Sequence, residues 1–280
     1  MTTEAKDLTQ KDYELIRRLV YFKSGINLGD QKQQLVRARL GKRVREGGFS
    51  SFRDYYHYVE KDQTGEELCY LLDAISTNTT HLFREMRHFT LLQEILRGWV
   101  NDSKWRSEHD SLRIWSAGCS SGEEPYSIAM VVHDVLRAHA GVKVKLLATD
   151  LSTQMLSKAA LGLYEVHRVG TVPPDYRHRY LKKATANGQE CLQVVPEVRR
   201  LITFSRFNLM TKRFPFRHGF HIVFCRNVMI YFDRETQTTL VGKYAEQLLK
   251  GGYLMIGHSE SLSSIDHPLS YVEPTVYRKD

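Results

Sequence analysis

The stretch that decides the fold is residues 114–127, with the sequence IWSAGCSSGEEPYS. It reads as a short apolar strand that stops in a polar loop at Gly118 and continues as a helix from Pro125. Residues 222–232, IVFCRNVMIYF, again place a polar loop directly after an apolar strand. In an open α/β sheet, loops at the carboxyl ends of strands meet in one crevice, and ligands bind there. The sequence therefore predicts a ligand site built from these two loops.

From about residue 111 onward, predicted strands alternate with predicted helices. The strands are 112–117, 144–149, 220–225 and 253–257, and the helices begin at Pro125, after Ser152 and after Asp233. We expect Gly251 and Gly252 to close the last of these helices. The alternation predicts an α/β fold with a parallel, doubly wound sheet. Residues 271–277 are expected to return antiparallel at its edge.

Two short β runs, 191–195 and 201–204, interrupt this alternation. They predict a small antiparallel β subdomain inserted at about residues 183–205. The expected organisation is an all-helical domain at 1–76, a linker and connecting helix at 77–110, and a sheet domain at 111–280.

Residues 1 to about 75 are predicted to be entirely helical. Thr9 is the expected cap of the first helix and Asp30 the expected cap of the second, because short polar side chains satisfy free amide groups at helix starts. Thr64 and Glu67 form a capping-box pattern for a fourth helix.

The composition is that of a folded globular protein, with 42% hydrophobic and 26% charged residues among 280. The polar N-terminus lacks the apolar core of a signal peptide, and no apolar run approaches the ~18 residues that cross a bilayer. We therefore expect a cytoplasmic protein without membrane insertion. The 4 cysteines and 12 histidines show no paired ligand spacing, so we expect no metal site and no disulfide framework.

The formal net charge of +8 favours an acidic partner. At about 100° per residue, Lys32, Arg39, Lys42 and Arg43 fall on one arc of the second helix. This basic face predicts a docking surface for an acidic partner. A helix face that is merely solvated fits the same pattern.

The loop 118–122 also satisfies GxSxG, the nucleophile elbow of serine hydrolases, with Ser120 as nucleophile and His258 as a conceivable base. In an elbow the helix begins at the serine, which would place Pro125 inside it at a cost of ~3 kcal/mol. If the loop instead continues to Glu124, Pro125 falls at the first helical position, where proline is favoured. The hydrolase remains an alternative.

The acidic residues of the loop indicate a different ligand. Glu123 and Glu124 at a helix start would repel the phosphate that such a position otherwise binds, and would attract a cation. A nucleoside that carries positive charge is S-adenosylmethionine, and Glu124 is the better candidate for its cationic part. Asp150 closes the second strand, where a carboxylate accepts both hydroxyls of a ribose. Glu124 as a helix-start acid and Asp150 as a helix cap are the alternatives.

Three further groups fit the same ligand. Asn208 and Asn227 each follow an apolar run, where amide groups suit adenine, and Leu209 provides an apolar face. Arg84 lies in the polar cluster 76–85 and matches a carboxylate with two parallel hydrogen bonds. A surface salt bridge of Arg84 with Glu85 or Asp73 is the alternative.

Taken together, the motifs are N-x-T-x-x-x-R-E at 78–85, S-A-G-x-S-x-G-E-E-P-Y-S at 116–127, A-T-D at 148–150, C-R-N-V-M-I-Y-F at 225–232 and G-H-S-E at 257–260. In this order they resemble the CheR family of chemotaxis receptor methyltransferases, over nearly the whole chain. The resemblance implies a Rossmann-like methyltransferase fold that moves a methyl group from S-adenosylmethionine to receptor glutamates. The products are glutamate methyl esters and S-adenosylhomocysteine.

By motif position, the resemblance implies that the cofactor contacts Asn78, Thr80, Arg84, Glu124, Asp150, Asn208, Leu209, Asn227 and Val228. Our catalytic hypothesis is that Arg84 orients the incoming carboxylate while Tyr231 shapes the same pocket.

The resemblance also implies partners. The basic second helix would meet the acidic helical cytoplasmic domain of methyl-accepting receptors. The β subdomain would be a docking site, which in some members holds a C-terminal receptor pentapeptide; its loop here, 183–188, has fewer glycines than in those members. The positive charge leaves a nucleic-acid methyltransferase as an alternative, but the sequence has no NPPY-like base-gripping loop, so we expect no nucleic-acid partner.

Overall fold

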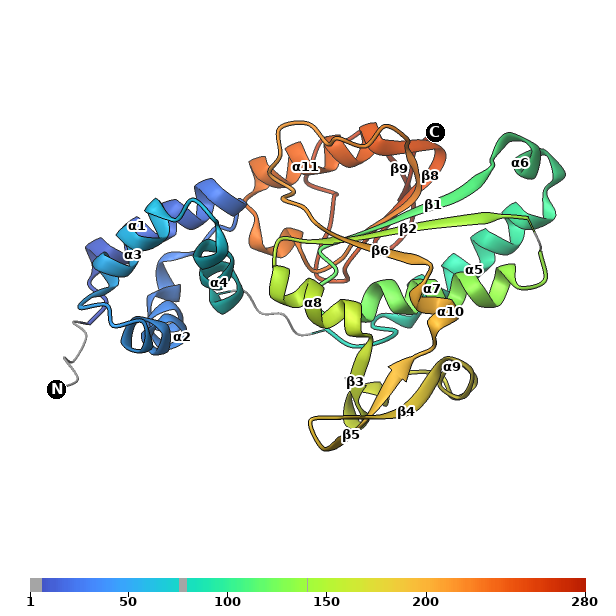
Figure 1. Cartoon of the computed structure of the whole chain (residues 1–280). Helices are drawn as coiled ribbons and strands as arrows, with labels where there is room; N and C mark the ends of the chain where they lie inside the picture. The colour runs from blue at the N-terminus through green and yellow to red at the C-terminus, as the bar shows by residue number, and fades with distance from the viewer. Residues whose placement is uncertain (1–6, 76–79, 140) are drawn as a thin grey trace.

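The computed structural model describes residues 7–75, 80–139 and 141–280. A helical domain of four helices lies beside a domain built on a sheet (Figure 1). The helices are α1 (Gln10–Ser24), α2 (Gln33–Glu46), α3 (Phe52–Lys61) and α4 (Glu66–Ile75), with a single 3-10 turn, η1 (Asp30–Lys32), before α2. Their buried faces share one apolar core that includes Tyr13, Leu40 and Tyr55.

The caps of the helical domain follow the local sequence in part. Thr9 caps α1 as predicted, because its hydroxyl accepts the Asp12 amide. Asp30 does not cap α2: it begins η1 and its carboxylate pairs with Arg17. The capping box is also wrong, because Glu67 turns its carboxylate to Arg43 instead. Each of the two carboxylates pairs with an arginine on another helix, and the local sequence does not show such a pairing.

The main sheet has seven strands in the order β6-β2-β1-β7-β8-β10-β9. They are β1 (Ser111–Ala117), β2 (Lys143–Asp150), β6 (Ile202–Arg206), β7 (Phe220–Cys225), β8 (Leu248–Ile256), β9 (Ser270–Glu273) and β10 (Val276–Arg278). The first five run parallel to one another, and β10 runs antiparallel to both of its neighbours, β8 and β9. The predicted doubly wound α/β sheet is thereby confirmed.

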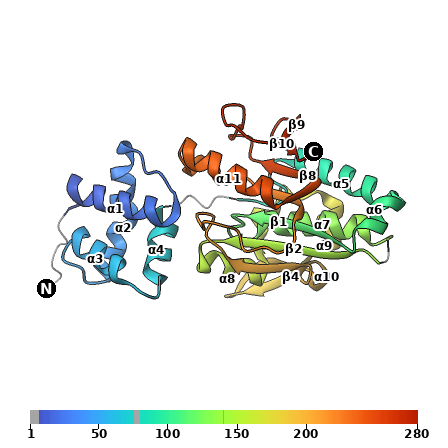
Figure 2. The same ribbon diagram turned by 90° about the horizontal axis from the view of Figure 1, so that it is seen from above.

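Alternate residues of the central strands enter different cores on the two faces of the sheet. Ile114 of β1 packs with α5 (Met86–Asn101) and α7 (Glu123–Leu136). The next residue, Trp115, packs with α11 (Arg234–Gln247) on the other face. Figure 1 shows α11 above the strands and α5 and α7 below them, and Figure 2 looks down on the same arrangement from the α11 side. The remaining helices are α6 (Ser103–Glu108), α8 (Thr153–Leu161), α9 (Pro174–Tyr180) and α10 (Pro196–Arg199), with the 3-10 turns η2 (Val166–Val169) and η3 (Met229–Tyr231).

The inserted β subdomain differs from the expectation of residues 183–205. Its sheet has the order β3-β5-β4, formed by β3 (Leu163–Glu165), β5 (Gln189–Val194) and β4 (Leu181–Ala186). The predicted run 201–204 lies in β6, which pairs in parallel with β2 in the main sheet. The predicted loop 183–188 is mostly strand, and the turn is only Asn187 and Gly188, both with positive φ. Such two-residue turns join hairpin strands directly.

Three boundaries in the sheet domain also moved. Helix α7 begins at Glu123, two residues before Pro125. Strand β8 begins at Leu248, so Gly251 and Gly252 lie inside a strand and do not close a helix. The predicted final strand is the hairpin β9–β10. The caps Ser152 and Asp233 are confirmed, since each accepts an amide in the first turn of its helix. Among the described residues, no helix combines the length and apolar character needed to cross a membrane.

Candidate active site

A cavity of about 460 Å³ opens at the carboxyl ends of the parallel strands, against the helical domain. The predicted residues that line it are Thr80, Arg84, Glu124, Asp150, Asn208, Leu209, Asn227, Val228 and Tyr231. Asn78 lies outside the described residues. The helical domain adds residues that sequence reasoning missed: Ser24, Ile26, Cys69, Leu72 and Asp73. The volume is within the ~300–1,000 Å³ typical of small-molecule sites.

The loop after β1 meets the loop after β7 at Gly118. A Cβ at Gly118, whose φ is +88°, would stand 2.4 Å from Cγ2 of Val228. Only glycine combines this backbone conformation with such a close approach. The amides of Gly118 and Cys119 both donate to the carbonyl of Thr149, at 2.8 and 2.9 Å. These contacts hold the loop against the end of β2.

Asp150 is held in place by backbone amides. One carboxylate oxygen accepts the Ser120 amide at 2.8 Å, and the other accepts the Ser152 amide at 2.9 Å. Burial raises the pKa of Asp150, although these hydrogen bonds act in the opposite direction. A carboxylate offers about four lone-pair positions, so the group keeps acceptor capacity for hydroxyl donors in the cavity.

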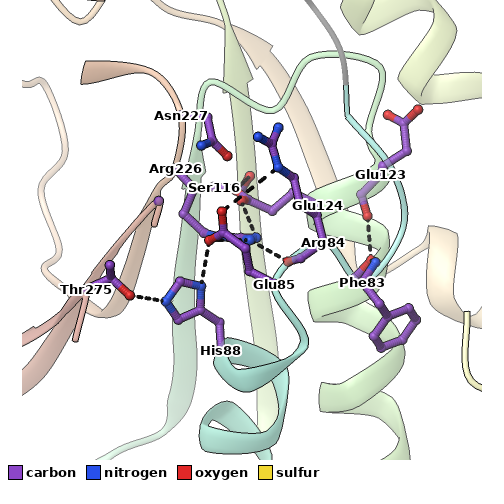
Figure 3. Close-up of polar contacts among 12 residues, drawn as sticks. Phe83, Arg84, Glu85, His88, Ser116, Glu123, Glu124, Arg226, Asn227 and Thr275 are labelled. Atoms are coloured by element: carbon purple, nitrogen blue, oxygen red, sulfur yellow. Dashed lines mark hydrogen bonds and ion pairs between the residues drawn. The ribbon is translucent and has the colours of Figure 1, made fainter. Parts of the chain in front are cut away.

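Glu124 is already paired, which its sequence position did not reveal. Its Oε2 lies 3.1 Å from Nη1 of Arg226, and its Oε1 accepts the Ser116 hydroxyl at 2.7 Å (Figure 3). Burial raises the pKa of Glu124 while Arg226 lowers it. Arg226 therefore favours the ionised form of this carboxylate, against the larger effect of burial.

Arg226 also orders the segment that carries Arg84. Its side chain is 2% exposed, and Nη2 donates to Glu85 Oε2 at 3.0 Å and to the backbone carbonyl of Arg84. Glu85 has a φ of +60° directly before α5, an uncommon conformation for such a residue. Arg84 Nε lies 4.0 Å from Glu85 Oε1, at the limit of an ion pair. Sequence reasoning missed Arg226, although it lies within the motif 225–232.

A second missed residue, Glu260, fixes the loop after β7. Its buried carboxylate accepts four backbone amides at 2.6 to 3.3 Å, from Gly257, Asn227, Met229 and Ile230. This explains how Asn227 keeps a φ of +60° at the cavity wall. The available signal was the glutamate of the block 257–260.

The helical domain is joined to the sheet domain beside the cavity. Asn208 Nδ2 donates to the carbonyl of Lys23 at 2.8 Å. The amide of Asn27 donates to the carbonyl of Tyr231 at 2.7 Å. Across the cavity, the hydroxyl of Ser152 donates to Asp73 at 2.7 Å.

Two of the four proposed docking cations are committed to the helical domain itself. Arg39 donates to the last carbonyl groups of α4, those of Ala74 and Ile75. Arg43 binds the buried Glu67 through two nitrogens, one at 2.8 Å. Both side chains are half-buried beside α4, so their charge is already partly used within the helical domain. Lys32 and Lys42 are exposed, Lys42 by 72% of its side chain.

The geometry does not form a serine–histidine pair. Ser120 Oγ is buried and has no hydrogen-bond partner in the described part of the chain. His258 lies instead against Glu85, with Nε2 3.9 Å from Oε2. A serine nucleophile needs a base within hydrogen-bond reach.

The charge of the cavity fits a cationic nucleoside better than a phosphate. Three carboxylates (Asp73, Glu124 and Asp150) and two guanidinium groups line it, so the ionised lining carries one net negative charge. Burial also lowers the pKa of the lining His81, which keeps it neutral. The buried hydroxyl of Ser120 and the pre-formed carboxylate of Asp150 are suited to a polar, hydroxyl-bearing ligand.

Comparisons with known proteins agree with this geometry. The family model described as "CheR methyltransferase, SAM binding domain" matches residues 78–278, and the one described as "CheR methyltransferase, all-alpha domain" matches residues 11–76. The chain is 38% identical to the chemotaxis protein methyltransferase of Borreliella burgdorferi, over 98% of this chain and 96% of that protein. It is 35% identical to the Salmonella typhimurium protein of the same name, over 98% and 92%. For the Escherichia coli protein the identity is 34%, over 98% and 93%.

Proposed function

Because this chain belongs to the CheR methyltransferase family, whose members methylate in chemotaxis with S-adenosylmethionine, we propose that it forms methyl esters on glutamate side chains of chemoreceptors. The observation that carries the proposal is the single cavity in which Arg84 and Tyr231 line the same space as Glu124, Asp150 and Asn227. Neither the serine hydrolase nor the nucleic-acid methyltransferase is supported by the family match.

Different lining residues would contact different parts of the cofactor. Asp150 would accept the ribose hydroxyls, because both its oxygens are oriented by backbone amides. Glu124, with part of its charge balanced by Arg226, would face the cationic amino-acid part. Asn208, Leu209, Asn227 and Val228 would surround the base, and Thr80 would line the cavity beside them. When bound, S-adenosylmethionine supplies a methyl group activated by its sulfonium.

The protein's own residues then have a positioning role. A glutamate carboxylate is ionised at pH 7, so the reaction needs no general base. The protein must align the carboxylate with the methyl group and exclude water. Arg84 lines the cavity and lies at the limit of ion-pair distance from Glu85. It would orient the incoming carboxylate without holding it so tightly that the nucleophile is weakened. Tyr231 would shape the same pocket.

Two surfaces would receive the receptor. The exposed Lys32 and Lys42 would meet its acidic helices, since Arg39 and Arg43 are engaged internally. Strand β4 is an outer strand of the small sheet, and an outer strand presents unpaired backbone groups to which a peptide adds as a further strand. A C-terminal receptor peptide would dock there.

The test is incubation of the full chain with methyl-labelled S-adenosylmethionine and receptor-containing membranes. We expect label on the receptor that mild base releases as methanol, because carboxyl esters hydrolyse under these conditions. Receptors with glutamine at the accepting glutamates serve as the matched control and should stay unlabelled. Base-stable label, or label on RNA instead of receptor, would refute the proposal. A Ser120→Ala variant should retain much of its methyltransferase activity. If the protein were a serine hydrolase, the same change would remove the nucleophile and abolish activity.

A further inference from the structure

Three side chains with metal-ligating atoms meet behind Arg84, outside the cavity lining. Glu85 and His88 lie one turn apart at the start of α5, and His258 follows β8, some 170 residues later in the sequence. Glu85 Oε2 lies 3.5 Å from His88 Nδ1 and 3.9 Å from His258 Nε2. All three ligand atoms lie within 4.8 Å of one another. The sequence offered no hint of this cluster, because His258 is brought in only by the sheet.

His88 has a nitrogen that the protein leaves without a partner. The side chain is 1% exposed, and Nδ1 has no hydrogen-bond partner among the described residues. The other nitrogen, Nε2, lies 2.7 Å from the hydroxyl of Thr275 (Figure 3). That hydroxyl donates to the carbonyl of Pro274, so it accepts from His88. On this hydrogen-bond network, Nε2 carries the proton and Nδ1 directs a lone pair toward Glu85.

The unprotonated Nδ1 and Glu85 Oε2 face each other at 3.5 Å with no hydrogen between them, an arrangement that a shared cation would stabilise. Neutral imidazole is the form that binds transition metals. We propose that Glu85, His88 and His258 bind one divalent transition-metal ion of the zinc class.

The distances fit this ion. Zinc–nitrogen and zinc–oxygen bonds of ~2.0–2.2 Å in a tetrahedron place neighbouring ligand atoms about 3.3 Å apart. The observed 3.5 and 3.9 Å are close to that spacing. His258 is 58% exposed, so its side chain has room to move onto the ion and leaves the fourth position to water. Two imidazoles with one carboxylate favour zinc-class metals over magnesium or calcium, which prefer oxygen ligands.

The surroundings provide the outer contacts that metal ligands usually have. Thr275 orients His88 through its other nitrogen, and Glu85 accepts from Arg226 and from the backbone amide of His258 at 3.3 Å. The charge is tolerable as well. Arg226 and Arg84 are balanced by Glu85 and Glu124, so no net positive charge opposes the ion.

The test is titration of the full, chelator-treated chain with Zn²⁺ alone, followed by calorimetry. We expect one equivalent to bind with an affinity that His258→Ala lowers by at least about tenfold. His258 is exposed, so the variant should unfold at the parent's temperature in the absence of metal. His167→Ala is the matched control, because His167 is an exposed histidine 3.3 Å from Glu165. It should bind Zn²⁺ like the parent.

Co²⁺ provides a second readout. Tetrahedral Co²⁺ with nitrogen and oxygen ligands gives intense visible d–d bands, which His258→Ala should abolish. Equal Zn²⁺ affinity in His258→Ala and parent would overturn the proposal. So would an equal loss in His167→Ala, or a thiolate charge-transfer band that assigns the ion to a cysteine.

Discussion

Arg226 and Glu124 join the carboxyl ends of two parallel strands through an ion pair of 3.1 Å in the wall of the cavity. The pair crosses from the loop after β7 to the start of α7, which follows β1. Arg226 extends the connection to Glu85 and to the backbone of Arg84. One side chain therefore ties together three segments that line the site, and its loss leaves two carboxylates without their cation.

Arg226→Met should lower the free energy of unfolding by ~3–5 kcal/mol, because breaking a buried pair leaves uncompensated charge. Urea denaturation measures this. Arg137→Met is the control, since Arg137 is exposed and pairs with Asp134 at 3.6 Å; it should change stability by less than ~0.5 kcal/mol. Similar values for the two variants would show that the Arg226 network does not stabilise the fold.

Arg84→Ala should reduce turnover by about 100-fold, because a misplaced reactant loses the alignment on which the rate depends. Affinity for S-adenosylhomocysteine should change much less, by about threefold or under. Single-turnover kinetics and calorimetry separate the two quantities. Arg87→Ala is a suitable control, since Arg87 binds Glu273 at the surface. An unchanged turnover in Arg84→Ala would remove the positioning role.

Affinity for S-adenosylhomocysteine should fall as the pH drops below neutrality. Burial raises the pKa of Asp150 in the free protein, whereas ribose hydroxyl donors bind the ionised form. Binding therefore lowers this pKa and releases a proton at acidic pH. Calorimetry at pH 5 in buffers of different ionisation enthalpy should detect that proton, and at pH 8 it should not. Asp150→Asn should bind more weakly and with a flatter pH profile, while the exposed Asp110→Asn should match the parent. A parent affinity independent of pH would contradict this assignment.

The free energy of unfolding should fall in mild acid because of His221. Burial, with smaller effects of His109 and Arg113, lowers the pKa of His221 to about 3, and its Nδ1 accepts the Arg113 amide at 3.0 Å. In the unfolded chain the pKa is about 6.5, so below pH 6.5 the unfolded state binds a proton that the folded state excludes. The stabilisation is complete above pH 6.5 and is lost as the pH falls toward 3, by up to ~1.4 kcal/mol per pH unit. Denaturation of His221→Asn between pH 7 and 4 should show a shallower slope than the parent, and the exposed His178→Asn the parent's slope.

Charge reversal should separate docking from folding in the helical domain. Lys32→Glu with Lys42→Glu should lower receptor methylation while the melting temperature and S-adenosylhomocysteine affinity stay unchanged. Arg43→Glu should instead destabilise the domain by ~2 kcal/mol or more, because it sets a carboxylate against the buried Glu67. Unaltered methylation by the double lysine variant would place receptor docking elsewhere.

Features that depend on residues close together in the chain could be predicted from the sequence. Thr9, Ser152 and Asp233 cap their helices because each hydroxyl or carboxylate reaches an amide only three residues away. The parallel sheet followed from strand and helix periods. Loops after parallel strands meet at one edge of the sheet. For this reason the nine predicted site residues between Thr80 and Tyr231 line one cavity.

Contacts between distant segments became visible only in the folded chain. Strand β6 pairs with β2 in the main sheet, and the residues at 201–204 carry no signal that distinguishes this pairing from one in the small sheet. Arg39 and Arg43 make internal contacts with α4, which their positions on the second helix did not indicate. The pairing of Glu124 with Arg226, and the meeting of Glu85 and His88 with His258, likewise join residues 100 or more positions apart. The sequence gives the chemistry of each side chain, but the path of the whole backbone decides which other side chain it contacts.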